Sequence, residues 1–195
     1  NPDHPYQDPR VHVSINDGRA FLESTDQVYD LILLALPDSL TLVGGQGSLR
    51  LENYLFTTEA INSLRDHLAP GGTFSMYNYY GPVAYARNVA AIDSVFGVAP
   101  CVDLGPSGAA SRQMASLTVG LDRTLDCGQV ATVESAAAKD LATDDHPFPY
   151  MRGRSVPPLY LVSVALVLLV SIFAVRWVGG PLRQMHEYLD LFFMG

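Results

Sequence analysis

The hydrophobic positions of this chain form one long uninterrupted segment near its end and several shorter periodic segments before it. Residues 156–175 contain no charged side chain. About 20 such residues, rising ~1.5 Å each, span the ~30 Å hydrocarbon core of a bilayer. Pro158 suits the first turn of a helix, and Tyr160 and Trp177 fall near its ends, where amphipathic rings favour the headgroup layer. A helix in a soluble core rarely stays apolar on every face, so the pattern predicts a transmembrane helix over residues 156–178.

The flanks of this segment leave its orientation open. The positive-inside count is a tie, because two arginines flank each end: Arg152 and Arg154 before it, Arg176 and Arg183 after it. Residues 189–195 resemble the opening of a second apolar segment, so residues 179–195 are expected to be a loop and the start of another membrane segment. The chain also begins without Met. We therefore expect a piece of a larger multi-pass membrane protein, with further membrane helices as partners.

The first 150 residues alternate between strand and helix patterns. Residues 11–15 alternate apolar and polar side chains and predict a strand. Residues 29–36 form a continuous apolar run, typical of a central parallel strand covered on both faces. Apolar residues recur at helical spacing over residues 57–68, and glycines follow that helix. The remaining predicted elements are a short helix at 19–23, a strand at 73–77, a helix at 83–96, and strands at 98–102 and 116–121.

This order of elements predicts an α/β fold with a partial doubly wound, Rossmann-like sheet. The strand, glycine loop and helix that would hold a nucleotide are not found, and we expect them to precede Asn1. Residues 130–150 turn polar and small, which indicates a linker. The predicted organisation is an α/β part over residues 1–143, a linker over residues 144–155, and the membrane segments after it.

Composition narrows the function classes. The chain has 195 residues and a formal net charge of −8, which argues against nucleic-acid binding. Cys101 and Cys127 are too few for a disulfide framework or a four-thiolate zinc site, and each is expected to be a small buried or semi-buried thiol. The five histidines lack metal-ligand spacing, so no metal is expected. Residues 44–47 lack the lysine of a phosphate loop and favour a mobile lid.

Five short motifs occur in a fixed order along the chain: Asp-Pro-Arg-Val at 8–11, Asp-Gly-Arg-Ala-Phe-Leu at 17–22, Tyr-Asp-Leu-Ile at 29–32, Phe-Thr-Thr-Glu at 56–59 and Leu-Ala-Pro-Gly-Gly at 68–72. Together they resemble the second half of spermidine synthase, the polyamine aminopropyltransferase family. Residues 144–148 resemble the Thr-Asp-Asp-x-Pro segment of bacterial forms fused to membrane helices. The resemblance implies the fold of class I S-adenosylmethionine-dependent methyltransferases and transfer of an aminopropyl group from decarboxylated S-adenosylmethionine to putrescine.

The resemblance assigns a ligand role to residues near the start of the chain. Asp17 matches the acidic residue that binds the adenine amino group, with Gly18 beside it. A carboxylate at the C-terminal edge of a strand can accept from an exocyclic N–H, and ligands bind at that edge in open α/β sheets. The alternative is a turn-forming aspartate before glycine. Both readings of Asp17 stay open.

The chain departs from the family at the end of the strand predicted over residues 29–36. There the family carries Asp-x-x-Asp, whose first carboxylate deprotonates the attacking amine and whose second holds the cationic end of the diamine. This chain has Ala35 and Asp38 at those positions. Ala35 cannot serve as a base, a role that contributes roughly 10²–10⁴-fold. Asp38 either binds a cation or forms a turn, and Tyr79 either lines the substrate pocket or joins an aromatic interface.

Three functions remain open at this point. The first is a membrane-tethered transferase of the spermidine synthase type. The second is a non-catalytic domain that binds a nucleoside or a polyamine and regulates an attached membrane part. The third is an S-adenosylmethionine-dependent methyltransferase with another small-molecule acceptor. In each case the expected partner is a lipid bilayer, the expected location is the cell membrane, and the α/β part is expected to face the cytoplasm.

Overall fold

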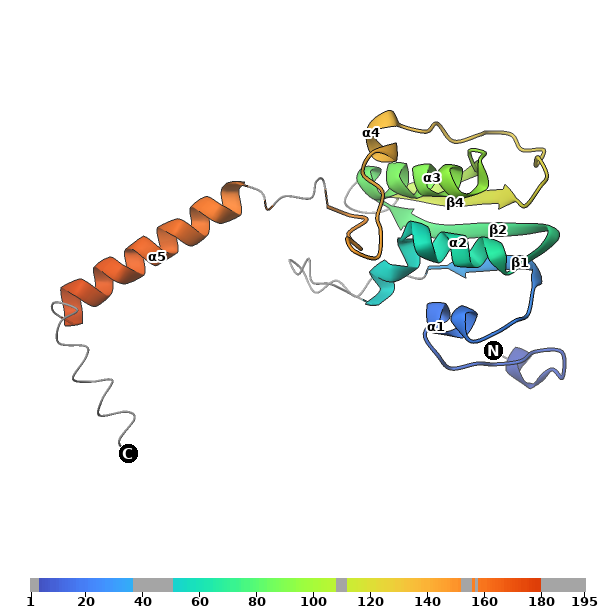
Figure 1. The fold of residues 1–195 in the computed structure, drawn as a ribbon, viewed down its shortest axis with the longest axis horizontal. Helices are drawn as coiled ribbons and strands as arrows, with labels where there is room; N and C mark the ends of the chain where they lie inside the picture. The colour runs from blue at the N-terminus through green and yellow to red at the C-terminus, as the bar shows by residue number, and fades with distance from the viewer. Residues whose placement is uncertain (1–3, 37–50, 108–111, 152–155, 157, 180–195) are drawn as a thin grey trace. The chain divides into compact units, whose positions relative to one another are not determined.

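The computed structural model describes residues 4–36, 51–107, 112–151, 156 and 158–179 (Figure 1). The chain divides into two compact units, Asn1–Arg152 and Gly153–Gly195. We call the first the α/β unit. Its elements, in chain order, are η1 Pro5–Gln7, α1 Gly18–Glu23, β1 Tyr29–Ala35, η2 Leu51–Phe56, α2 Thr58–Asp66, β2 Leu68–Tyr80, α3 Pro82–Phe96, β3 Cys101–Ser107, β4 Gln113–Gly120 and α4 Ser135–Ala138.

The sheet of the α/β unit has the strand order β1-β2-β4-β3. β1 and β2 are parallel and are connected through α2, whereas β4 runs antiparallel to both β2 and β3. The α/β class is therefore confirmed, but the two closing strands are not parallel. The short connection between β3 and β4 explains this, because a parallel pair needs a crossover of a dozen or more residues.

The two long helices begin within one residue of the predicted positions, and α3 ends where the sequence predicts, whereas α2 ends at Asp66, two residues early, because β2 begins at Leu68. The side chain of Thr57 caps α2 by accepting a hydrogen bond from the backbone N–H of Ala60 at 3.3 Å. α3 has Pro82 in its first turn and ends at Gly97, whose φ of 72° suits a residue without a Cβ. These caps fix the ends of both helices.

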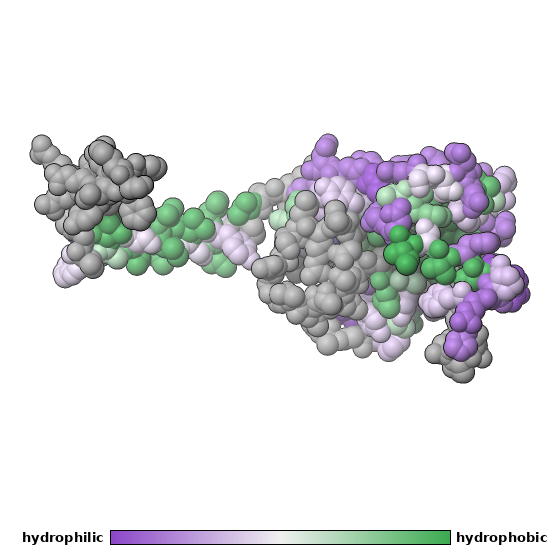
Figure 2. All heavy atoms as spheres, turned by 90° about the horizontal axis from the view of Figure 1, so that it is seen from below, coloured by the Kyte–Doolittle hydropathy of each residue, from purple (hydrophilic) through white to green (hydrophobic). Residues whose placement is uncertain are grey.

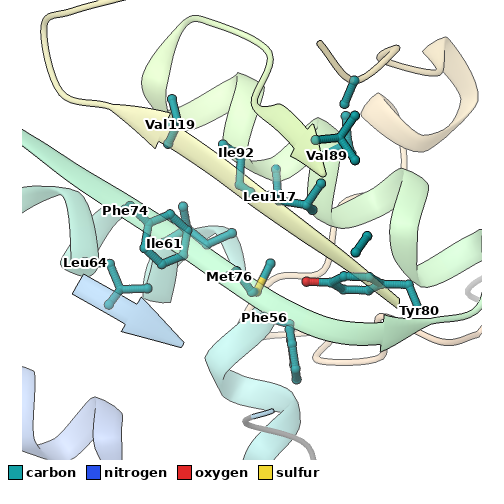
Figure 3. Close-up of a cluster of buried hydrophobic side chains, with 14 of the residues drawn as sticks. Phe56, Ile61, Leu64, Phe74, Met76, Tyr80, Val89, Ile92, Leu117 and Val119 are labelled. Atoms are coloured by element: carbon teal, nitrogen blue, oxygen red, sulfur yellow. The ribbon is translucent and has the colours of Figure 1, made fainter. Parts of the chain in front are cut away.

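One face of the sheet carries the hydrophobic core (Figure 3). Phe74 and Met76 of β2 are fully buried and point to the same side of the strand. Ile61 of α2, Ile92 of α3 and Leu117 of β4 belong to the same buried cluster. Two amphipathic helices thus cover one face of a sheet whose apolar residues alternate with period two.

β1 differs from the prediction of a strand covered on both faces. It is one of the two edge strands of the sheet that the described residues form, and Leu31 and Leu33 are 58% and 55% exposed. The alternate residues Ile32 and Leu34 are half-buried against the core. A space-filling view shows separate hydrophobic patches on the α/β unit among hydrophilic surface (Figure 2). A run of apolar residues indicates a strand that can be covered on both faces, but it does not supply the second layer.

The strand predicted over residues 11–15 is wrong for this structure. Residues 11–15 have no regular secondary structure, and Val13 and Ile15 are 58% and 99% exposed. A strand exists only where a neighbour supplies hydrogen-bonding partners, and none of the described strands pairs with this segment. Alternation alone could not reveal that the partner is missing.

Residues 130–151 pack on the α/β unit although their composition indicates a linker. Ala131 and Ala142 are buried, and the backbone N–H of Ala131 donates to the carbonyl of Pro100 at 2.9 Å. The buried guanidinium of Arg87 donates to the carbonyl of Phe148 at 2.8 Å and pairs with Asp140. The small residues of this segment allow its backbone to pack closely against the α/β unit. The same composition would also suit a solvent-exposed linker, so it could not reveal the packing.

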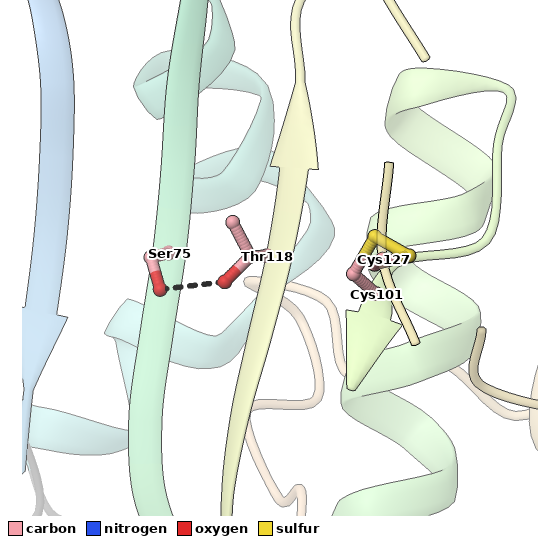
Figure 4. Close-up of a disulfide and its surroundings, with 4 residues drawn as sticks. All are labelled: Ser75, Cys101, Thr118 and Cys127. Atoms are coloured by element: carbon pink, nitrogen blue, oxygen red, sulfur yellow. Dashed lines mark hydrogen bonds between the residues drawn. A yellow bond between two sulfur atoms is a disulfide. The ribbon is translucent and has the colours of Figure 1, made fainter. Parts of the chain in front are cut away.

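Cys101 and Cys127 form a disulfide, so the expectation of two free thiols is wrong (Figure 4). Their Cα atoms are 5.9 Å apart although 26 positions separate them in sequence. The pairing of Cys101 with Val130, and the hydrogen bond from Val102 N–H to the carbonyl of Gln129 at 2.9 Å, bring the second cysteine beside β3. The backbone pairing of β3 with residues 129–130 brings the two cysteines together, and their spacing along the sequence does not reveal it.

The second unit contains α5, Pro158–Gly179. Its apolar side chains are exposed around the whole helix, and Trp177 is 78% exposed. By length and composition, residues 158–177 could cross a membrane, and no other helix among the described residues could. The predicted apolar helix over residues 156–178 is confirmed as a helix. Residues 179–195, where a second membrane segment is expected, lie outside the described residues apart from Gly179.

Candidate functional site

The carboxyl end of the parallel pair β1 and β2 forms the candidate site, since ligands of open α/β sheets gather at such an edge. Ala35 ends β1, and it is the register partner of Tyr77 on β2. The backbone N–H of Leu36 then donates to the carbonyl of Tyr77 at 2.9 Å. The position that the family resemblance assigns to the base is thus fixed beside the carboxyl-terminal part of β2, a long, well-paired strand.

Ala35 presents only a methyl group there, and this residue is exposed. The next residue, Leu36, has a φ of 48°, a left-handed conformation that is uncommon for a residue with a branched side chain. Backbone of this kind costs about 1–3 kcal/mol and persists only where its surroundings hold it, as at many ligand sites. Asp38 and the glycines of residues 44–47 follow this turn but lie outside the described residues.

Tyr79 lies two residues beyond Tyr77, so the two side chains share one face of β2. It is half-buried, and its backbone N–H donates to Oδ1 of Asn78 at 2.7 Å. Tyr80 points to the core instead, where burial raises the pKa of its phenol and the ring packs edge-on against Tyr85. The aromatic contact observed here belongs to Tyr80, and the two roles expected for Tyr79 both stay predictions.

Asp17 is the N-cap of α1. Its Oδ1 atom accepts from the backbone N–H groups of Arg19 and Ala20, both at 3.0 Å. Capping therefore occupies one carboxylate oxygen, while none of the hydrogen bonds found among the described residues uses Oδ2. The geometry gives Asp17 a capping role at the start of α1, and the ligand role stays a prediction that Oδ2 could serve.

Gly18 shows no packing requirement for glycine. A Cβ at this position would meet only Leu55 Cδ2, at 3.8 Å, which is an ordinary van der Waals contact. Its φ is not among the left-handed values of the described glycines. Contacts within the described part of the chain therefore do not explain why glycine follows Asp17.

Sequence reasoning missed the strongest polar contact near Asp17. Arg19 donates from both terminal nitrogens to both carboxylate oxygens of Asp144, each at 2.6 Å. Thr57 Oγ1 also donates to Asp144 Oδ1 at 2.8 Å. The Arg19 guanidinium, helped by Thr57, lowers the pKa of Asp144 below its ordinary value. The only available signal was that Arg19 and Asp144 each stand inside a motif of the family resemblance.

The structure brings some predicted residues together and leaves others apart. Ala35 and Tyr79 lie on neighbouring strands at one sheet edge. Asp17 lies on α1, and none of the hydrogen bonds among the described residues joins it to either of them. No group of three or more His, Cys, Asp or Glu that could hold a metal ion occurs within the described residues.

Comparison with known proteins gives partial matches. No family model matches the chain. A polyamine aminopropyltransferase from Nitrosomonas europaea is 33% identical over 97 residues, which is 48% of this chain and 27% of that protein. The chain thus spans about a quarter of the length of this curated relative. The relative acts as an aminopropyltransferase by its name, and its remaining length has no counterpart in the match.

Three solved structures similar to this chain carry the name spermidine synthase, one of them as a probable one. The Thermotoga maritima enzyme gives a TM-score of 0.42 at 18% identity, over 59% of this chain and 35% of that one. A probable spermidine synthase from Corynebacterium glutamicum gives 0.45 at 20% identity, over 62% and 41%. A spermidine synthase in complex with a transition-state analogue gives 0.44 at 14% identity, over 83% and 51%. Within the described residues the sheet itself is mixed, with the parallel pair β1 and β2 extended by the antiparallel strands β4 and β3.

Proposed function

We propose that this chain is the C-terminal half of a spermidine synthase-like domain that transfers an aminopropyl group from decarboxylated S-adenosylmethionine to a polyamine acceptor. The observation that carries the proposal is the 97-residue segment that is 33% identical to a polyamine aminopropyltransferase. In this role Asp17 and Gly18 would contact the adenine of the donor. Asp38 and Tyr79 would contact the acceptor at the sheet edge where β1 and β2 end.

The chemistry defines what the site must supply. The acceptor nitrogen attacks the aminopropyl carbon bound to the sulfonium, and the carbon–sulfur bond breaks with its electron pair going to sulfur. The products are the extended polyamine and methylthioadenosine, and the attacking nitrogen must lose a proton. Ala35 cannot take that proton, so the site needs a base from elsewhere in the protein or works slowly.

Ala35 also favours a second function, a domain that binds a nucleoside or polyamine without catalysis. Such a domain would keep the adenine contact of Asp17 and lose only the proton acceptor. A methyltransferase with another acceptor would likewise tolerate Ala35, provided that its acceptor needs no base. The donor that binds, and the product that forms, separate these possibilities.

Membrane attachment and location belong to the same proposal. We infer that α5 anchors the protein in a lipid bilayer together with further helices of the full-length protein, because its apolar surface is exposed on every side. A cytoplasmic α/β unit gives access to the donor, whereas a structural disulfide is rare in reducing compartments. If the α/β unit faces the cytoplasm, cellular reductants should open the Cys101–Cys127 disulfide, so membrane-permeant maleimide should label both cysteines in intact cells without added reductant. A disulfide that resists labelling there would place the unit in an oxidising compartment and contradict the cytoplasmic location.

Ligand binding and product formation test the proposed function on the full-length protein. Decarboxylated S-adenosylmethionine and methylthioadenosine should raise its melting temperature, because a ligand that binds only the folded state stabilises that state. S-adenosylmethionine should do so less if the protein is an aminopropyltransferase. Binding of decarboxylated donor without product would support the non-catalytic domain. A shift with S-adenosylmethionine alone would support the methyltransferase, and no shift with any of the three would contradict every adenosine-based function.

A further inference from the structure

α1 has little local support for its position. It has six residues and begins with glycine, and Leu22 is its only buried side chain. Isolated helices shorter than ~12–15 residues are marginal in water, so contacts with other elements must hold this one. The most extensive polar contact that α1 makes is the pair formed by Arg19 and Asp144.

The geometry of this pair restrains both partners. Two parallel hydrogen bonds of 2.6 Å join the guanidinium to the carboxylate, an arrangement that fixes orientation as well as distance. Asp144 is also held from α2, since it accepts from Thr57 Oγ1 at 2.8 Å, and its own N–H donates to Glu59 Oε2 at 3.1 Å. The Arg19 side chain is only 20% exposed. α1 is therefore attached to the start of α2 through a rigid bridge.

The first turn of α1, which carries Arg19, also contacts Asp17. The backbone N–H of Arg19 donates to Asp17 Oδ1 at 3.0 Å, and that of Ala20 donates to the same oxygen at 3.0 Å. These two bonds set the rotation of the carboxylate, and with it the direction in which Oδ2 points. Moving the first turn of α1 would therefore move Oδ2, even though Asp17 itself does not touch Asp144.

We propose that the Arg19–Asp144 pair is a positioning device that aims Asp17 Oδ2 at the amino group of an adenine ligand and so determines selectivity for 6-amino over 6-oxo purines. This inference rests on the proposed function. Arg19 and Asp144 act through Asp17 and touch no ligand. Asp144 thereby has a specific role inside a segment whose sequence indicates only a turn or a linker.

The test compares two probes on the full-length protein: methylthioadenosine, whose 6-amino group donates, and methylthioinosine, whose 6-oxo group accepts. A carboxylate acceptor should favour the first by at least about tenfold in Kd, the size expected for one hydrogen bond to a charged group. Arg19→Gln and Asp144→Asn should each reduce this preference several-fold. Arg19→Lys keeps the charge but loses the two-pronged geometry, and it should reduce the preference as well.

Two controls separate positioning from general destabilisation. Glu23→Gln removes the other ion-pair partner of Arg19, at 3.0 Å, and should leave the preference unchanged. Asp17→Asn should abolish the preference, and adding Asp144→Asn to it should cause no further loss, because both changes act on one contact. The reversed pair, Arg19→Asp with Asp144→Arg, should recover part of the preference.

The outcomes distinguish failure of the positioning role from failure of the proposed function. A lower melting temperature for Arg19→Lys and Asp144→Asn with an unchanged preference would reduce the pair to a structural contact and overturn the inference alone. Additive losses for Asp17→Asn and Asp144→Asn would overturn it too. Absence of methylthioadenosine binding by the unsubstituted protein would overturn the proposed function, and the positioning role with it.

Discussion

Ala35 of β1 and Tyr77 of β2 are direct register partners at the carboxyl end of a parallel pair. Their side chains therefore share one face of the sheet, with Tyr79 two residues further along β2. The residue at the family's base position thus has a methyl group beside a tyrosine, with Leu36 in a left-handed turn after it. If the proposed site lies here, its backbone is in place and only the proton acceptor is lacking.

The disulfide should contribute measurably to the stability of the α/β unit. Replacing both Cys101 and Cys127 by serine should lower the free energy of unfolding by about 3 kcal/mol, because the link closes a loop of moderate length in the unfolded chain. Denaturant unfolding of the oxidised protein and of the variant measures this loss. Reductant should destabilise the unsubstituted protein and leave the variant unchanged. Equal stabilities with and without reductant would show that the two cysteines are not paired in solution.

Local patterns were sufficient to predict the helices, because their signals are contained within the elements. The starts of α2 and α3 and the end of α3 agree with the predicted ranges to within one residue, whereas α2 ends two residues early. The apolar run of β1 likewise predicted a strand in parallel pairing. In each case the residues that form the element also carry the information about where it begins or ends.

The features that sequence could not reveal depend on partners distant along the chain. Arg19 and Asp144 are 125 positions apart, and nothing in the sequence around either residue indicates that the other is its partner. The exposed face of β1 and the unpaired residues 11–15 depend on whether a neighbouring layer or strand is present. Periodicity indicates which faces can be buried, and only the tertiary structure decides what buries them.

His67 should make stability depend on pH. Its ring nitrogens lie 2.7 Å from the carbonyl oxygen of Ser63 and 2.9 Å from that of Thr25, so the doubly protonated ring can donate to both. These backbone acceptors, Ser63 first, raise the pKa of His67 above its ordinary value. A raised pKa in the folded state means that the contribution is complete below about pH 6.5 and is lost as pH rises through the folded pKa.

The measurement is the difference in unfolding free energy between the unsubstituted protein and His67→Gln. It should be larger at pH 5.5 than at pH 9, since only the lower pH retains the charged ring. Other titrating groups are common to both proteins and cancel in this difference. A difference that is the same at both pH values would show that the charge of His67 does not contribute.

The α5 helix should behave as a membrane anchor. Extraction of membranes with alkaline carbonate should leave the full-length protein in the pellet, because residues 158–175 of the helix are uncharged and form a continuous apolar surface. Leu168→Arg places a charge near the middle of the helix, at a cost of about 2.5–3.5 kcal/mol on insertion scales, and should reduce the pelleted fraction if α5 is the anchor. Release of the unsubstituted protein into the supernatant would contradict the membrane assignment.

Restoring a carboxylate at position 35 tests the catalytic part of the proposal. Aminopropyl transfer to putrescine by the full-length protein should be very slow or absent, and Ala35→Asp should increase it. Ala35 is exposed within the described residues, so an aspartate fits at this position without displacing a neighbouring side chain. The gain should fall within the ~10²–10⁴-fold range that a positioned base contributes.

Product formation from decarboxylated S-adenosylmethionine and putrescine measures this gain, with Ala35→Asn and Asp38→Asn as controls. Ala35→Asn has the same shape as the aspartate but cannot accept the proton, so it should stay as slow as the unsubstituted protein. Asp38→Asn should weaken putrescine binding in the Ala35→Asp background, since it removes the second carboxylate of the family's pair, the one expected to hold the cationic end of the diamine. An equal gain for Ala35→Asn would show that position 35 does not supply a base. Rapid turnover by the unsubstituted protein, unaffected by Asp38→Asn, would place the reaction away from the carboxyl end of β1.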